Sequence, residues 1–240
     1  MNNYPPQYNQ QAYQQAWGGQ SFSSHVSAVM KSVYARMTVA LLVTGLIAMF
    51  CGHSLGYLRF IASNMWFTIV LAIAEIGIVI GVSAGINKLS SSAATLLFYL
   101  FAVVNGLLLA PIFVIYTGVS IAKTFFITAG TFAAMSVYGY STNRDLSRMG
   151  SILFMALIGL IIASIVNIFA ASSTLDWIIS GAGVLIFVGL TAWDTQQIKT
   201  MAQQMPAASA GRLATLGALS LYLDFINLFL YLLRFFGDRD

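Results

Sequence analysis

The sequence predicts an all-α, polytopic membrane protein with seven transmembrane helices. Hydrophobic residues make up 59% of its 240 residues, charged residues make up 8%, and the mean hydropathy is +0.83. Because soluble domains carry about 25% charged residues, this composition excludes a soluble globular fold. One membrane crossing needs about 20 predominantly apolar residues, and residues 33–236 contain seven such runs.

Short polar turns separate the seven apolar runs. The expected crossings are residues 33–52, 65–85, 93–116, 121–140, 149–171, 175–197 and 213–236. They form one transmembrane domain, residues 26–240, which follows a tail. Residues 1–25 are rich in Gln, Asn, Tyr and Pro and carry no charge before His25. They cannot bury a core, so we expect them to be disordered.

The first two runs are predicted to play different parts. Run 33–52 follows a segment with neither a basic start nor an apolar stretch, so we expect it to act as the insertion signal. In run 65–85, Gly77, Gly81 and Gly85 recur every four residues, which predicts close packing of that face against another helix.

The third run contains a helix breaker. Pro111 cannot donate a backbone hydrogen bond, so it should kink this helix and free the carbonyl of Leu107. Runs 121–140 and 149–171 are bounded by the polar turns TGVS and STNRDLSR. The last two runs are joined by the longest connection, KTMAQQMPAASAGR.

Basic residues predict the orientation of the chain. Those on the side of the N-terminus are Lys31, Arg36, Lys88, Arg144, Arg148, Lys199 and Arg212. Those on the other side are Arg59, Lys123, Arg234 and Arg239. Since basic residues concentrate on the cytoplasmic side of membrane proteins, we expect a cytoplasmic N-terminus and an external C-terminus. The net charge is +4, and the eleven Lys and Arg residues are scattered singly along the chain. This pattern argues against a nucleic-acid partner and leaves the lipid bilayer as the surroundings.

Motifs for metal or catalytic chemistry are not evident. Cys51 is the only cysteine, so no intramolecular disulfide can form, and we expect it to pack as a small apolar residue. His25 and His53 are isolated, and the sequence contains neither a phosphate-binding loop nor a Ser/His/Asp set. We therefore expect no enzyme activity, no cofactor and no resident metal.

Three of the seven carboxylates interrupt apolar runs. Glu75 lies in the second run, Asp194 in the sixth and Asp224 in the seventh. An ionised acid at the centre of a membrane helix costs about 2.5–3.5 kcal/mol even on insertion scales, so such residues usually serve protons or cations.

Helical spacing places polar residues beside both aspartates. The seventh run carries a stripe of Gly217, Ser220, Asp224, Asn227 and Tyr231, and the sixth carries Thr191, Asp194 and Gln197. If the stripes face each other, the two carboxylates share a proton and titrate as a unit. The pair would then be a pH sensor, or a cation site when ionised. The plainer alternative is one structural hydrogen bond to a neighbouring helix.

Four motifs resemble one family. LSLYLDFINLFLYLLRFFG at 219–237 and GLTAWDTQQIK at 189–199 are similar to signature motifs of the Bax inhibitor-1 family. NGLLLAPIFVIYT at 105–117 and SVYGYSTNRDLS at 136–147 resemble its bacterial members, and the similarity extends over residues 25–237. The resemblance implies six helices around a central seventh, a pH-sensitive calcium leak and a bacterial inner membrane.

The same resemblance implies roles for individual residues. Asp194 and Asp224 would form a hydrogen-bonded pair on the cytoplasmic side, and Glu75 would lie in the pore. Relatives also carry a basic cluster at the end of the second helix, whose arginine holds the sixth-helix aspartate. Here that region reads GVSAGINKLSS, so Lys88 is the candidate latch, although it lacks the planar fork of arginine.

The leading hypothesis is a cation leak, with Ca²⁺ as the transported ion, gated by protonation of the Asp194/Asp224 pair. A drop in pH would neutralise the pair and alter helix packing near it. A second hypothesis is an intramembrane aspartyl protease, but Leu-Tyr-Leu precedes Asp224 where those enzymes carry Gly-x-Gly. A third is a non-conducting regulator that binds a membrane protease or another membrane protein, with residues 1–25 as the contact segment.

Overall fold

The computed structural model describes residues 22–86 and 88–238, and these ranges contain helices and no strand. The helices are α2 (Phe22–Gly52), α3 (Leu55–Ser63), α4 (Met65–Gly85), α5 (Ser91–Leu109), α6 (Ile112–Ile115), α7 (Gly118–Ser141), α8 (Ser147–Ala170), α9 (Ser173–Gln204), the short η1 (Ala207–Ser209) and α10 (Ala210–Phe236). Seven helical segments in this part of the chain are long and apolar enough to cross a membrane. The predicted all-α polytopic fold is thereby confirmed.

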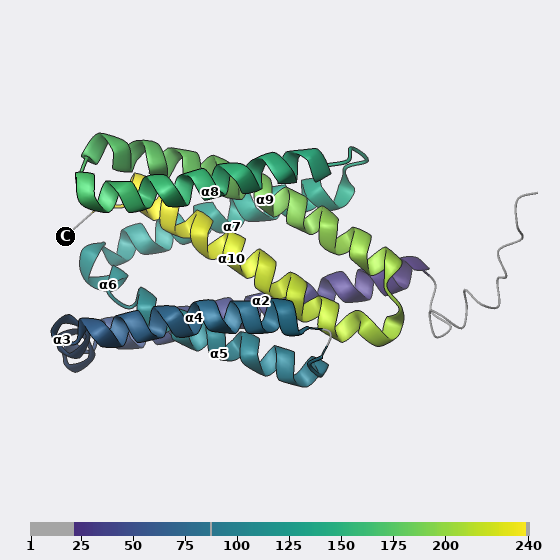
Figure 1. The fold of residues 1–240 in the computed structure, drawn as a ribbon, viewed down its shortest axis with the longest axis horizontal. Helices are drawn as coiled ribbons and strands as arrows, with labels where there is room; N and C mark the ends of the chain where they lie inside the picture. The colour runs from purple at the N-terminus through teal and green to yellow at the C-terminus, as the bar shows by residue number, and fades with distance from the viewer. Residues whose placement is uncertain (1–21, 87, 239–240) are drawn as a thin grey trace, which may run out of the picture.

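The last helix lies at the centre of the molecule. Figure 1 shows α10, in yellow, running obliquely between α8 and α9 on one side and α2, α4 and α5 on the other. About 67% of its apolar stretch is buried, against 6% for both α4 and α8. A helix that is apolar all round must be covered on all sides by protein or by lipid, so α10 is the core helix and α4 and α8 are peripheral.

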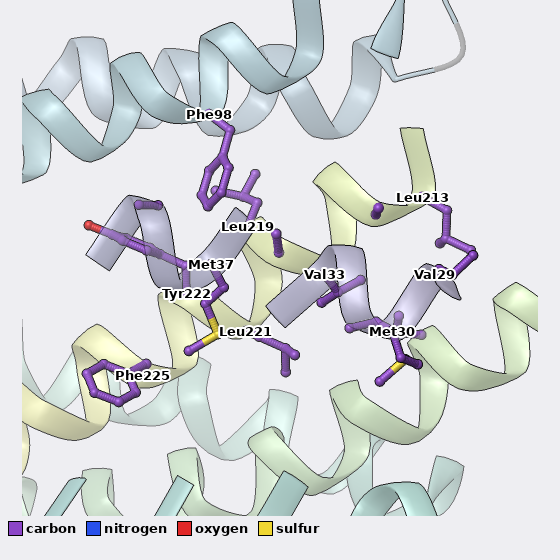
Figure 2. Packing of buried hydrophobic residues seen from close by; sticks show 14 of the residues in the cluster. Val29, Met30, Val33, Met37, Phe98, Leu213, Leu219, Leu221, Tyr222 and Phe225 are labelled. Atoms are coloured by element: carbon purple, nitrogen blue, oxygen red, sulfur yellow. The ribbon is translucent and has the colours of Figure 1, made fainter. Parts of the chain in front are cut away.

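The main core forms where α2, α5 and α10 meet. Figure 2 shows Val33 and Met37 from α2, Phe98 from α5 and Tyr222 from α10 gathered in this cluster. The ring of Tyr222 is fully buried and packs edge-on against Phe98, with the ring centroids 5.7 Å apart. The outer surface is apolar as well: Val119 is 80% exposed and Phe169 is 86% exposed. Such a surface suits lipid contact.

Helix boundaries differ from the prediction where tertiary packing extends a helix. The first helix begins at Phe22, inside the expected tail, because its early turns bury Val29 and Met30 in the core. Helix α9 continues to Gln204 and buries Ala202 against the same cluster. The short helix α3 was not predicted. The remainder of the expected tail, residues 1–21, lies outside the described residues.

The predicted break at Pro111 is confirmed. Helix α5 ends at Leu109 and α6 begins at Ile112. The Leu107 carbonyl, which would otherwise accept a bond from position 111, accepts one from the Tyr57 hydroxyl at 2.9 Å. A neighbouring element thus satisfies the freed carbonyl, as membrane helices with internal proline require.

The predicted close-packing face of α4 is wrong. A Cβ at Gly77 or Gly81 would meet no atom within 4 Å, so this face contacts no other described helix of the chain. Close approach occurs instead at Gly139 of α7, where a Cβ would lie 2.1 Å from the Ala192 carbonyl oxygen of α9. Four-residue glycine spacing predicts a flat face, but it does not identify what covers that face.

Candidate functional site

The structure brings Asp194 and Asp224 together. Helices α9 and α10 are consecutive and antiparallel, and they pack along much of their length. Asp224 is 4% exposed and its carboxyl group lies within hydrogen-bonding range of that of Asp194, which is partly buried. Ser220, one turn before Asp224 on the same face of α10, donates a hydrogen bond to Asp194 Oδ2. The sequence pattern therefore identified a real cluster.

One oxygen of the pair, Asp224 Oδ2, is buried and receives no hydrogen bond from the described residues. Ionised carboxylates only accept hydrogen bonds, so two of them in contact cannot satisfy each other. A proton on either carboxyl group turns the contact into a hydrogen bond between the two acids. The geometry thus suits a pair that holds at least one proton.

A cavity opens beside the pair. It has a volume of about 260 Å³, and its polar lining consists of Ser83 of α4, Asp194 and Gln197 of α9, and Ser220 of α10. The rest of the lining is apolar: Ile198, Met201, Leu216, Gly217, Leu219 and Leu223. A volume of this size accommodates several water molecules, each of which occupies about 30 Å³ in the liquid. Asp194 therefore contacts a space large enough for water or a hydrated ion.

The expected supporting stripe is mostly not part of the site. Thr191 donates to the carbonyl of Phe187 and Asn227 to the carbonyl of Leu223, each within its own helix. Tyr231 stacks on the Phe187 ring, with centroids 5.8 Å apart. Of the four residues predicted to support the aspartates, only Ser220 bonds one of them. Short polar side chains such as Thr191 and Asn227 can instead bond the backbone of their own helix.

Lys88 does not act as a latch in this structure. It lies exposed in the turn after α4, and no ion pair joins it to Asp194 within the described chain. A different basic residue secures the start of α10. Arg36 of α2 donates to the Gly211 carbonyl at 2.6 Å and to the Thr215 hydroxyl. The sequence predicted only an orientation charge for Arg36, although a guanidinium followed by an apolar run indicates a partner within the protein.

Glu75 belongs to a second polar cluster. It is partly buried on α4, where Asn105 Nδ2 of α5 donates to its carboxylate. Asn105 Oδ1 in turn accepts from the Tyr222 hydroxyl at 3.0 Å, and that hydroxyl lies 2.6 Å from Thr44 Oγ1 of α2. None of these three partners was predicted from the sequence. Asn105 and Thr44 are single polar residues in apolar runs, and no sequence spacing pairs them or Tyr222 with Glu75.

The described part of the chain offers no cluster of three His, Cys, Asp or Glu side chains that could hold a metal ion. Tight Ca²⁺ sites use six to eight oxygen ligands, whereas the aspartate pair supplies two carboxylates and one hydroxyl. The arrangement suits proton binding and transient contact with a cation.

Comparison with known proteins gives a consistent result. A family model described as "Inhibitor of apoptosis-promoting Bax1" matches residues 26–240. The inner membrane protein YbhL of Escherichia coli K12 is 50% identical over 213 residues, covering 88% of this chain and 91% of that protein. An uncharacterized protein of Borreliella burgdorferi is 46% identical over 88% of this chain and 91% of its own length. A third, from Rickettsia prowazekii, is 43% identical over 91% and 93% of the two chains.

Proposed function

Because this chain belongs to the Bax inhibitor-1 family of multi-pass membrane proteins, we propose that it is a pH-sensitive cation leak of the bacterial inner membrane. The transported ion is Ca²⁺, and protonation of the Asp194/Asp224 pair gates its passage. The observation that supports this most strongly is the contact between the buried carboxyl group of Asp224 and the partly buried one of Asp194, on adjacent helices and beside a cavity.

The gate follows from the charge of the pair. With one shared proton, the two carboxyl groups attract each other and hold α9 against α10. When that proton leaves, two like charges face each other in a desolvated site, and their repulsion favours separation. Separation at this point enlarges the cavity beside Asp194 and Ser220. The ionised carboxylates then offer oxygen ligands, which Ca²⁺ prefers.

The orientation of the chain belongs to the same proposal. Seven basic residues lie on the side of the membrane that holds the N-terminus, and four lie on the other side. This difference favours a cytoplasmic N-terminus. The sensor would then report cytoplasmic pH. Reporter fusions at either end of the chain test this orientation.

The function is tested by Ca²⁺ flux into liposomes containing the purified protein, measured from about pH 5 to about pH 8, where shifted carboxyl groups titrate. Asn supplies an amide donor in place of the shared proton. In Asp194→Asn and Asp224→Asn, flux should therefore stay near the acid-side level of the wild-type protein at every pH. Asp176→Asn is the matched control on α9, because Asp176 pairs with Arg234 and does not touch the site.

Two results would count against the proposal. Absence of flux at every pH would eliminate the leak itself. A wild-type pH dependence in both asparagine variants would eliminate the aspartate gate while leaving a leak. For Glu75→Gln we expect altered conduction with the pH response of the aspartate pair retained.

A further inference from the structure

A line of hydrogen bonds joins four helices on the side of α10 that faces away from the aspartates. Residues 222 and 224 are about 200° apart around a helix with 3.6 residues per turn. Tyr222 therefore points to α2 and α5 while Asp224 points to α9. The line runs from Glu75 through Asn105 and Tyr222 to Thr44, which donates to the Ala102 carbonyl at 2.9 Å.

With the Asn105 amide oriented as observed, this line has fewer hydroxyl protons than hydrogen-bond contacts. The hydroxyls of Tyr222 and Thr44 make three contacts: Tyr222 to Asn105 Oδ1, Tyr222 to Thr44, and Thr44 to the Ala102 carbonyl. Each hydroxyl has one proton to donate, so two protons must serve three contacts. One contact is left without a hydrogen, in a place where Tyr222 is fully buried and Thr44 is 2% exposed.

Turning the Asn105 amide over corrects the count. Its NH₂ group then faces the Tyr222 hydroxyl and supplies the third proton, so Tyr222 donates to Thr44 and Thr44 donates to the Ala102 carbonyl. The amide oxygen now faces Glu75 instead. Two acceptor oxygens in contact repel unless the carboxyl group of Glu75 is protonated, in which case Glu75 donates to Asn105.

We propose that Asn105 is a switch whose side-chain amide turns over when Glu75 gains a proton. Ionised Glu75 fits the observed orientation of the Asn105 amide, in which one contact has no hydrogen. Protonated Glu75 fits the turned orientation, in which every contact has one. A change in the protonation of Glu75 on the peripheral helix α4 thereby changes the hydrogen bonds of Tyr222 on the central helix. The switch concerns a second site and does not depend on the aspartate pair.

Other titratable groups do not complicate this site. Glu75 is the only charged residue of α4, and α5 carries none. The one tyrosine of α5, Tyr99, stacks on Phe98. Two further helices pack on α4. From α10 the group that faces Glu75 is Tyr222, and from α3 the candidates are Tyr57, which bonds the Leu107 carbonyl, and Arg59, which is exposed.

The experiment uses the fact that Glu75 is the only glutamate in the sequence. Isotope-labelled glutamate in the full chain, held in lipid nanodiscs, gives one carboxyl NMR resonance whose shift reports protonation of Glu75. Titration from about pH 4 to about pH 9 spans the range in which carboxyl groups of folded proteins titrate. Wild type is compared with Tyr222→Phe, Thr44→Val and the double variant, with Thr44→Ser as the control that keeps the hydroxyl.

Each single variant removes the extra hydrogen bond that the protonated state gains. The midpoint of Glu75 protonation should therefore fall by about half to one pH unit, the equivalent of one hydrogen bond. The double variant should shift no further than either single variant, because the same bond is lost only once. Thr44→Ser should titrate like the wild type.

Additive shifts in the double variant, unshifted single variants or a Glu75 resonance that does not titrate would each overturn the switch. If the substitutions only loosened the core, the shifts of the two single variants would add in the double variant. Comparison of the single and double variants therefore separates loosening from the proposed coupling. Tyr222→Phe keeps the ring between Phe98 and Phe101, and this variant alone remains decisive if the double variant does not fold.

Discussion

Replacement of Gly139 by alanine should loosen the helix pair that carries the aspartate sensor. A Cβ at Gly139 would lie 2.1 Å from the Ala192 carbonyl oxygen, about 1.3 Å short of the 3.4 Å at which ordinary contact begins. The obstacle is backbone, which cannot turn aside as a flexible side chain does. Overpacking of a close-packed core costs about 1–3 kcal/mol, and a backbone obstacle places Gly139→Ala in the upper half of that range.

Gly130→Ala on the same helix is the matched control, because a Cβ there would meet no atom within 4 Å. Both substitutions gain the same helix propensity, up to about 1 kcal/mol. Thermal unfolding in detergent, followed by tryptophan fluorescence, should show Gly139→Ala melting about 4–12 °C below the control, given about 2–4 °C per kcal/mol for a chain of this size.

Equal melting temperatures for the two variants would refute the close approach of α7 and α9. Ala192 lies two residues before Asp194, so the same variant also tests the sensor. Displacing α9 should change the pH dependence of Ca²⁺ flux in Gly139→Ala and leave it unchanged in Gly130→Ala.

Three further outcomes are expected. Tyr57→Phe leaves the Leu107 carbonyl with only the longer bond from the Ala110 N–H at 3.4 Å. It should therefore reduce the free energy of unfolding by about 0.5–1.5 kcal/mol, measured by the same thermal assay. Arg36→Met keeps the apolar stem but removes the donors to the start of α10, so we expect a comparable loss, and an unchanged melting temperature would contradict that role. The hydrogen bond from the Ser147 backbone N–H holds the pKa of Asp145 below its ordinary value. Its contribution to stability is present above the unfolded pKa of about 3.9 and lost as pH falls through the folded value, so Asp145→Asn should remove that part of the acid dependence.

Much of the fold was predictable because the bilayer imposes simple rules on a chain. Apolar runs of the required length identified seven crossings, and the proline rule identified both the break at Pro111 and the carbonyl that it frees at Leu107. Three- and four-residue spacing also placed Ser220 and Asp224 on one face of the last helix. Each of these inferences depends on local sequence and helix geometry alone.

Other features depended on which helices become neighbours. The glycine spacing in α4 predicted close packing against another helix, yet Gly77 and Gly81 contact no other described helix of the chain. Lys88 was the predicted latch, but it lies exposed, and Arg36 makes the contacts to the start of α10. The extension of α2 into the expected tail followed from burial of Val29 in a core built by distant segments.

Seven membrane crossings and three acids inside apolar runs could be predicted from the residues alone, because hydropathy and helical periodicity are local properties. Which groups contact those acids depends on how the helices pack. Asp194 and Asp224 meet each other across α9 and α10, while Glu75 is bonded by Asn105 and, through it, linked to Tyr222. The physical reason is that a buried polar group must find its hydrogen-bond partner in space, and partners from different helices leave no common spacing in the sequence.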